Sequence, residues 1–165
     1  MKFWARRFLI AAFLAGATVL VSATLQANGA AGPSVTLAPD TAAATGVRWT
    51  VRMVVPYCGG YKVGGYVALR FLAPFVLPPA VPSAAVSFAD GPATVLEKGN
   101  TLRIAPAPGR MWSMLCGTDL PLEVVIGKSA RLRNPRRPGR YALEISTEAN
   151  PAPARVSVLV RPAPP

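Results

Sequence analysis

The sequence predicts an antiparallel β-sandwich of about 8–9 short strands, preceded by an N-terminal hydrophobic signal helix. Three observations lead to this prediction. Apolar and polar residues alternate with period two in several short runs, which is typical of half-buried strands. Prolines, of which the chain has 18, fall between these runs, where a missing N–H interrupts no ladder of hydrogen bonds. No helical periodicity follows Leu25, so the rest of the chain is expected to be all-β.

The start of the chain has the pattern of a secretory signal. A basic beginning is followed by the uncharged residues 8–25 and then by small residues that fit A-x-A-like cleavage at Ala23 or Ala27. The alternative is an uncleaved anchor, because residues 8–25 are just long enough to span a membrane, and membrane contact is expected only through them. In both cases the basic flank stays inside, so the remainder should be extracytoplasmic, either secreted or at the cell surface. The basic residues are Lys2, Arg6 and Arg7.

Three parts of the chain are expected: a signal peptide or signal anchor at residues 1–30, one β-sandwich domain at residues 31–161, and a Pro-rich tail at residues 162–165. Residues 47–55 carry the clearest strand pattern, with apolar residues at every second position and a high content of Val, Trp and Thr. Residues 98–100 form a Gly-containing turn between two β-type runs and predict a hairpin. The other expected strands are residues 34–37, 67–71, 86–88 (ended by a turn at 90–92), 93–97, 101–105, 122–126, 141–145 and 156–160.

Four segments, in the same order along the chain, resemble motifs of Ig-like β-sandwich repeat modules of bacterial cell-surface proteins. The resemblance covers about residues 34–160, and here it is expected to concern a single stand-alone module. It implies an Ig-like fold and a non-catalytic structural, adhesive or surface-assembly role. The chain departs from the modules by its two cysteines and by the loop at residues 109–118. The matching segments are 35–51 (VTLSP-type opening), 75–79 (F-x-L-P), 99–104 (GNTLTI-type hairpin) and 133–148 (KNPxxAGTYTL-type closing strand).

The composition leaves little material for catalysis or metal binding. The chain has no histidine, two cysteines and seven acidic residues. Without histidine, Ser-His-Asp and Cys-His nucleophiles are excluded, and two cysteines are too few for Cys-rich zinc or iron–sulfur sites. The acidic residues form no cluster that resembles a calcium loop. We therefore expect no enzyme, no small-molecule substrate, no cofactor and no metal.

Cys58 and Cys116 are the first candidate site. In an oxidising compartment, two cysteines of a small domain most often pair. If the strands reverse direction at every connection, both cysteines emerge at the same end of the sandwich, and a disulfide between them would stabilise the fold by about 4 kcal/mol in the chain-entropy model. A free thiol and an intermolecular bridge are the alternatives.

A basic segment is the second candidate site. The formal net charge is +11, and six cations fall within residues 128–140 with no acid among them. Arginine donates bidentate hydrogen bonds that match phosphate and sulfate oxygens, so the segment is a candidate for binding a polyanion, either a cell-wall polymer, an acidic glycan or nucleic acid without sequence specificity. The alternative is a solvated loop whose charge deters edge-to-edge pairing. The six cations are Lys128, Arg131, Arg133, Arg136, Arg137 and Arg140.

A Gly- and Tyr-rich stretch is the third candidate, as a patch for a protein partner, which would be another surface protein or a second copy of the chain. Tyr57, Tyr61 and Tyr66 belong to it, and Trp112 lies in the other cysteine-containing segment. The alternative is that these aromatic rings cover the end of the core. With strict reversal of strand direction, the basic segment would lie at the end of the sandwich opposite to the cysteines.

Overall fold

The computed structural model describes residues 32–55, 65–108, 120–148 and 150–164. These residues form nine strands and two single-turn 3₁₀ helices, η1 (Ser83–Ala85) and η2 (Lys128–Ala130), and they contain no α-helix. The prediction that the chain after Leu25 is all-β is confirmed for these residues. The strands are β1 (Ser34–Ala38), β2 (Arg48–Val55), β3 (Val67–Phe71), β4 (Val86–Phe88), β5 (Gly91–Lys98), β6 (Thr101–Pro106), β7 (Leu120–Ile126), β8 (Gly139–Thr147) and β9 (Ala154–Val160).

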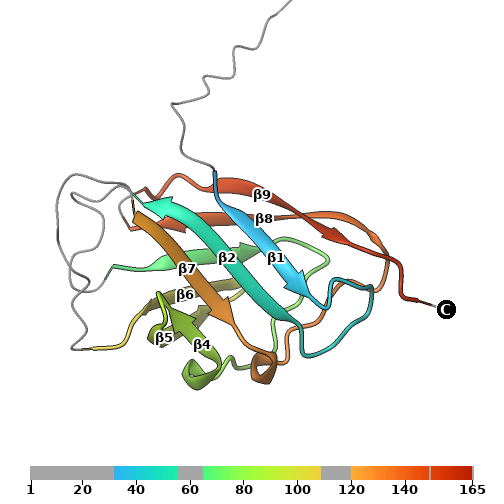
Figure 1. The fold of residues 1–165 in the computed structure, drawn as a ribbon, viewed down its shortest axis with the longest axis horizontal. Coiled ribbons are helices and arrows are strands. Elements are labelled where there is room, and N and C mark those ends of the chain that lie inside the picture. The colour runs from blue at the N-terminus through green and yellow to red at the C-terminus, as the bar shows by residue number, and fades with distance from the viewer. Residues whose placement is uncertain (1–31, 56–64, 109–119, 149, 165) are drawn as a thin grey trace, which may run out of the picture.

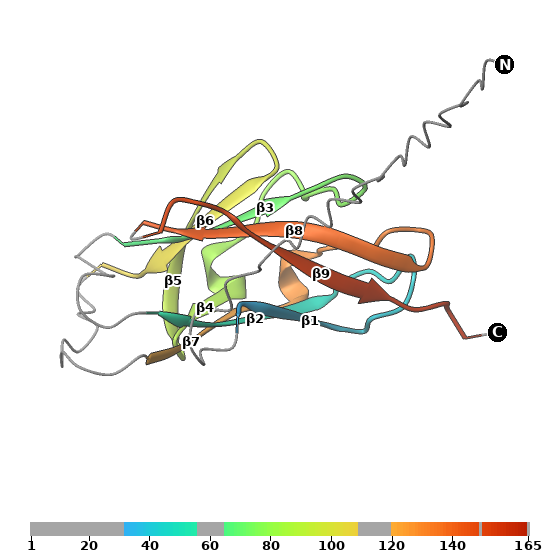
Figure 2. The ribbon, with the colours of Figure 1, turned by 90° about the horizontal axis from the view of Figure 1, so that it is seen from above.

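All strand pairs are antiparallel and belong to one continuous sheet in the order β1-β2-β7-β4-β5-β6-β3-β8-β9. β5 carries the chain from one side of the molecule to the other, because Gly91 and Pro92 pair with β4 while residues 93–98 pair with β6. As a result, β1, β2 and β7 face β3, β6 and β8 across the interior (Figure 2). The antiparallel arrangement that the sequence predicts is therefore confirmed.

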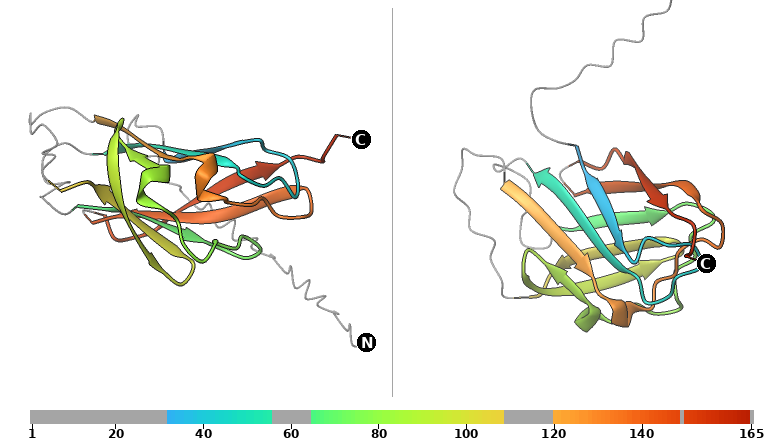
Figure 3. Two further views of the ribbon diagram at one scale, coloured as in Figure 1. Left: turned by 90° about the horizontal axis from the view of Figure 1, so that it is seen from below. Right: turned by 45° about the vertical axis from the view of Figure 1, so that its right-hand side comes forward.

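The sheet is nearly closed, because its first and last strands meet at one end (Figure 3). Thr41 and Arg161, which follow β1 and β9, form a parallel bridge. The Arg161 N–H donates to the Asp40 carbonyl at 2.7 Å, and the Ala42 N–H donates to the Arg161 carbonyl at 2.8 Å. β1 and β9 thus run in the same direction and converge toward their C-terminal ends.

The turn between β4 and β5 differs from the expectation by one or two residues. Phe88 pairs with Gly91 and Ser87 with Pro92, so the turn consists of Ala89 and Asp90, both with positive φ (47° and 59°). A two-residue hairpin of type I′ requires positive φ at both turn residues, and its backbone twist matches that of the strands. Gly91 and Pro92 therefore belong to a strand rather than to the turn.

The interior is filled by the apolar residues of the period-two runs. Trp49, Leu69 and Leu102 are among the largest fully buried side chains. Trp49 lies 5.1 Å from both Phe71 and Phe75, measured between ring centroids, and meets Phe75 nearly edge to face at 74°. Aromatic pairs of this geometry add to the stabilisation that burial alone gives. The cluster fixes Phe75, and with it the irregular segment that follows β3.

Different connections lie at the two ends of the strands (Figure 1). Val55 pairs with Leu120 at one end of the β2–β7 ladder, and Trp49 pairs with Ile126 at the other. The chain enters the segment that carries Cys58 from the first end, and it returns from the segment that carries Cys116 at that same end. The connection from η2 to β8, with most of the predicted cations, lies at the second end. Cys58 and Cys116 are outside the described residues, so their disulfide stays a prediction.

The expected signal segment, residues 1–30, also lies outside the described residues. Within the described part of the chain, no helix is long and apolar enough to cross a membrane.

Candidate anion-binding groove

The connection between η2 and β8 is fastened to the connection between β1 and β2 by the backbone. The Val47 N–H donates to the Leu132 carbonyl at 3.1 Å, the Asn134 N–H to the Ala44 carbonyl at 3.0 Å, and the Ala43 N–H to the Pro135 carbonyl at 2.9 Å. Three hydrogen bonds of alternating direction hold two irregular segments together as a short ladder would. The side chains of residues 131–137 therefore project from a defined backbone.

Asn134 adds a side-chain clamp to this ladder. It is 4% exposed, and its Nδ2 donates to the carbonyls of Pro39 at 3.0 Å and Thr41 at 2.9 Å. Two carbonyl partners determine which side of the amide carries the nitrogen. The Oδ1 atom is left buried without a partner among the described residues. Asn134 is thus a structural residue that ties residues 39–41 to the connection between η2 and β8 (residues 131–138), which we call the basic connection.

Buried and exposed residues alternate over residues 130–134. Ala130 and Leu132 are buried, with 1% and 2% exposure, whereas Arg131 and Arg133 between and after them are exposed. Arg131 has a positive φ of 56°, which turns the chain out of η2. Arg131 and Arg133 border the same groove.

Residues 74–79, which we call the apolar wall, form the other side of this groove. Phe75 is buried in the aromatic cluster, and it also meets Tyr141 of β8 at 5.7 Å between ring centroids. Beyond the wall, the Val81 N–H donates to the Glu97 carboxylate. The segment is therefore attached on both sides, while Val76 between these attachments is 75% exposed.

The groove between the basic connection and the apolar wall has a volume of about 1010 Å³. We refer to the arginines that line it as the groove arginines. Tyr141 spans the two sides: its ring packs on Phe75 and its hydroxyl donates to the Arg137 carbonyl at 2.7 Å. The groove arginines are Arg131, Arg133, Arg136 and Arg137.

None of the groove arginines makes an ion pair or a side-chain hydrogen bond within the described residues. Asp40, the carboxylate nearest in sequence to the groove loops, is bound to Arg161 at 3.1 Å. Glu123 and Glu144 pair with other arginines on the strands. The positive charge of the groove arginines is therefore not neutralised by these carboxylates, and a concave surface of one sign concentrates anions.

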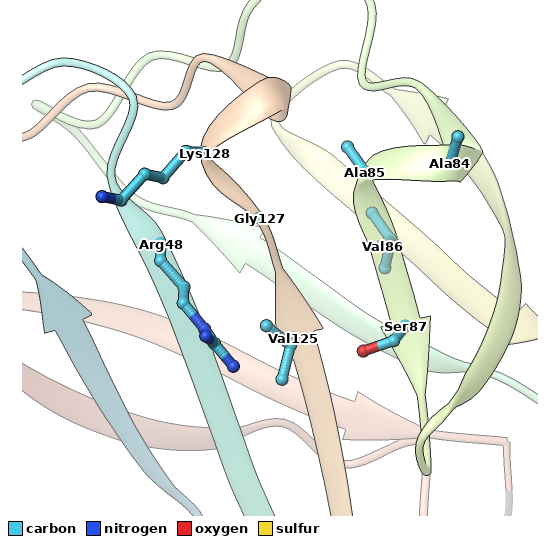
Figure 4. Close-up of a pocket in the computed structure, with 8 residues that line it drawn as sticks. All are labelled: Arg48, Ala84, Ala85, Val86, Ser87, Val125, Gly127 and Lys128. Carbon is cyan, nitrogen blue, oxygen red and sulfur yellow. The ribbon is translucent and has the colours of Figure 1, made fainter.

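The six cations that the sequence indicates as one set do not lie on one surface. Four of them line the groove, whereas Arg140 lies on β8, paired with Leu159 of β9. Lys128 borders a separate hollow of about 350 Å³ between β2, β7 and β4. Figure 4 shows that Arg48 of β2 shares this hollow, with its charged end directed away from that of Lys128. The hypothesis of a single six-residue site is therefore replaced by one of a four-residue site.

Sequence reasoning did not select the apolar wall, Asn134 or Tyr141 as parts of a site. The pair Val76-Leu77 could have indicated the apolar wall, because the prolines on both sides keep this segment out of a β-ladder. Two apolar residues there are not explained as the buried face of a strand. Asn134 carries no such signal, since nothing local distinguishes a buried asparagine from an exposed one.

One residue of the candidate partner patch, Tyr66, belongs to the part of the chain that the structure describes. Tyr57, Tyr61 and Trp112 lie outside the described residues. Tyr66 is half-buried, and the Arg103 guanidinium lies 4.5 Å from the centre of its ring. A cation in this position covers one face of the ring, so Tyr66 offers only part of its surface to a partner.

Comparison with other proteins adds no assignment: no family model matches the chain, and neither a curated protein nor a solved structure matches it. In the described part of the chain, Asp and Glu residues form no group of three that could hold a metal ion.

Proposed function

We propose that this chain is an exported, non-catalytic binding module that captures an anionic ligand in the groove. The observation that carries the proposal is the set of four groove arginines on one concave surface, without a carboxylate partner among the described residues. Guanidinium groups donate two parallel hydrogen bonds to phosphate, sulfate or carboxylate oxygens. The hydrogen-bonded backbone beneath them reduces the entropy lost when a ligand binds.

We further propose that the nearly closed sheet is an Ig-like β-sandwich, as the four ordered sequence motifs imply. Modules of that kind have structural, adhesive or surface-assembly roles. Such a role fits an anion-binding groove when the ligand is an anionic component of the cell envelope, since binding would then attach the module to the surface. The amino-terminal signal pattern supports export to a place where such components occur.

The proposal is tested by titrating the exported protein with polyphosphate at increasing salt concentrations. We expect a steep loss of affinity with salt, because bound counterions are released when cations contact the polymer. Replacement of the four groove arginines by serine should reduce the slope of log K against log salt by about 3.

A matched variant removes the same charge elsewhere: Arg48, Lys98, Arg140 and Arg155 are replaced by serine. These residues are exposed and make no ion pair within the described residues. We expect this variant to keep most of the affinity. If both variants lose binding equally, net charge alone accounts for it, and the groove has no special function.

A further inference from the structure

We propose that the ligand of the groove is an anionic amphiphile with a single aliphatic chain, whose head contacts the groove arginines and whose chain lies on the apolar wall. This inference rests on the proposed anion-binding function and specifies the class of ligand. Its first basis is that charge and apolar surface border one groove: Val76 and Leu77 line it together with Arg133 and Arg136.

The exposure of Val76 is the second basis. Three large hydrophobic residues are exposed in the described part of the chain: Val76 at 75%, Leu96 at 65% and Leu159 at 44%. Leu96 and Leu159 lie on strands, paired with Arg103 and Arg140. Val76 instead borders a groove together with Leu77 and four prolines. An apolar surface rimmed by polar groups is characteristic of a binding site.

The chemistry of the apolar wall distinguishes between classes of ligand. Sugar rings and nucleic-acid bases are commonly held by stacking on exposed aromatic faces. Tyr141 is the aromatic residue among those that line the groove, and both its ring and its hydroxyl are already engaged, by Phe75 and by the Arg137 carbonyl. The residues of the apolar wall that line the groove, Val76, Leu77 and three prolines, are aliphatic. A flexible alkyl chain therefore fits this wall better than a ring does.

The size of the groove agrees with this class. Its volume of about 1010 Å³ lies at the upper end of the range of about 300–1,000 Å³ found for sites of small organic ligands. An inorganic anion would leave the apolar wall uncovered. The Tyr141 hydroxyl and ring link the two sides of the groove, so the distance between the arginines and the wall is set before the ligand arrives.

The test uses butyl, octyl and dodecyl phosphate below their micelle concentrations, with inorganic phosphate as reference, titrated calorimetrically into the exported protein. We expect affinity to rise with chain length, by up to about fourfold for each methylene group that the wall covers. Val76→Ser should lower the affinity for dodecyl phosphate about fivefold and leave that for butyl phosphate nearly unchanged. Leu96→Ser, which removes an exposed leucine outside the groove, should change neither.

The possible outcomes separate this inference from the function on which it rests. If the groove arginines are required for binding but butyl and dodecyl phosphate bind equally, the anion-binding function stands and the amphiphile is excluded. Equal binding of dodecyl phosphate and dodecyl maltoside would show that charge is not recognised and would overturn both. Binding to phosphatidylglycerol vesicles without binding of the monomeric alkyl phosphates would assign the groove to a membrane surface and overturn the inference.

Discussion

Arg52 and Arg70 lie on strands, and each has a carboxylate directly across the ladder from it. Arg52 is paired in register with Glu123 and Arg70 with Glu144, and the ion pairs measure 2.7 and 3.1 Å. The groove arginines lie in an irregular connection and have no such partner among the described residues. Strand register thus neutralises Arg52 and Arg70, whereas the four groove arginines stay unpaired and gather on one concave surface. This difference is what makes the groove, and not the basic composition as a whole, the candidate site.

The largest effect is expected from releasing the basic connection from the rest of the fold. Asn134→Leu removes the two hydrogen bonds that Nδ2 donates to the carbonyls of Pro39 and Thr41. Each such bond contributes about 0.5–1.5 kcal/mol, so we expect a loss of about 1–3 kcal/mol in the free energy of unfolding, measured by urea denaturation.

Asn150→Leu is the control for this variant, because Asn150 is exposed and its hydrogen bonds involve the backbone. We expect its stability to stay within about 0.5 kcal/mol of the parent. A similarly small change for Asn134→Leu would show that the clamp contributes little, and the groove arginines would then be held by the backbone ladder alone.

An intermediate effect is expected when a carboxylate is introduced opposite one of the groove arginines, in the way that Glu123 lies opposite Arg52 on the strands. Thr45 is exposed and bridged to Arg133, and side chains at directly opposed positions lie on the same face. Thr45→Glu should therefore pair with Arg133 and lower the affinity for polyphosphate several-fold. Thr45→Gln, which has the same shape without the charge, should retain the parent affinity, and an equal loss in both variants would point to steric obstruction instead.

The smallest effect is expected on the strands. Glu123→Gln breaks the ion pair with Arg52, both partners of which are substantially exposed to solvent. Such pairs contribute about 0–1 kcal/mol, so thermal unfolding should change little. Affinity for polyphosphate should also remain the same, although an arginine has been freed. An increase comparable to the contribution of a groove arginine would mean that any unpaired arginine suffices, and the contrast between the two regions would disappear.

The elements of the fold were predictable from local patterns, because burial on one face of a strand imposes period two on the sequence. Eight of the nine expected runs lie within strands, and the ninth, residues 47–55, begins one residue before β2. The order of the strands was not predictable in this way, since the pairing of β7 with β2 and β4 joins residues far apart in the chain. The sequence also grouped Lys128 and Arg140 with the groove arginines. Their separation depends on the turn at Arg131 and on where β8 begins, which are properties of the backbone.

The place of the apolar wall beside the groove arginines could not be predicted from the sequence, for a related reason. The apolar wall borders the arginines because Phe75 is anchored in a cluster with Trp49 and Tyr141. That cluster assembles residues from three separate parts of the chain. A site composed of one charged loop and one apolar segment becomes visible only when the packing that joins them is known.

The bridge between Thr41 and Arg161 has a mechanical consequence. Because β1 and β9 run in the same direction, the first described residues lie toward one end of the strands and the last toward the other. Tension between the two ends would pull along the strands and load the β1–β2 and β8–β9 ladders in shear, with many hydrogen bonds bearing the force together. Unzipping, in which bonds break one after another, would require a pull across the strands. A pull on the two ends of the described fold would therefore meet resistance from whole ladders of hydrogen bonds at once.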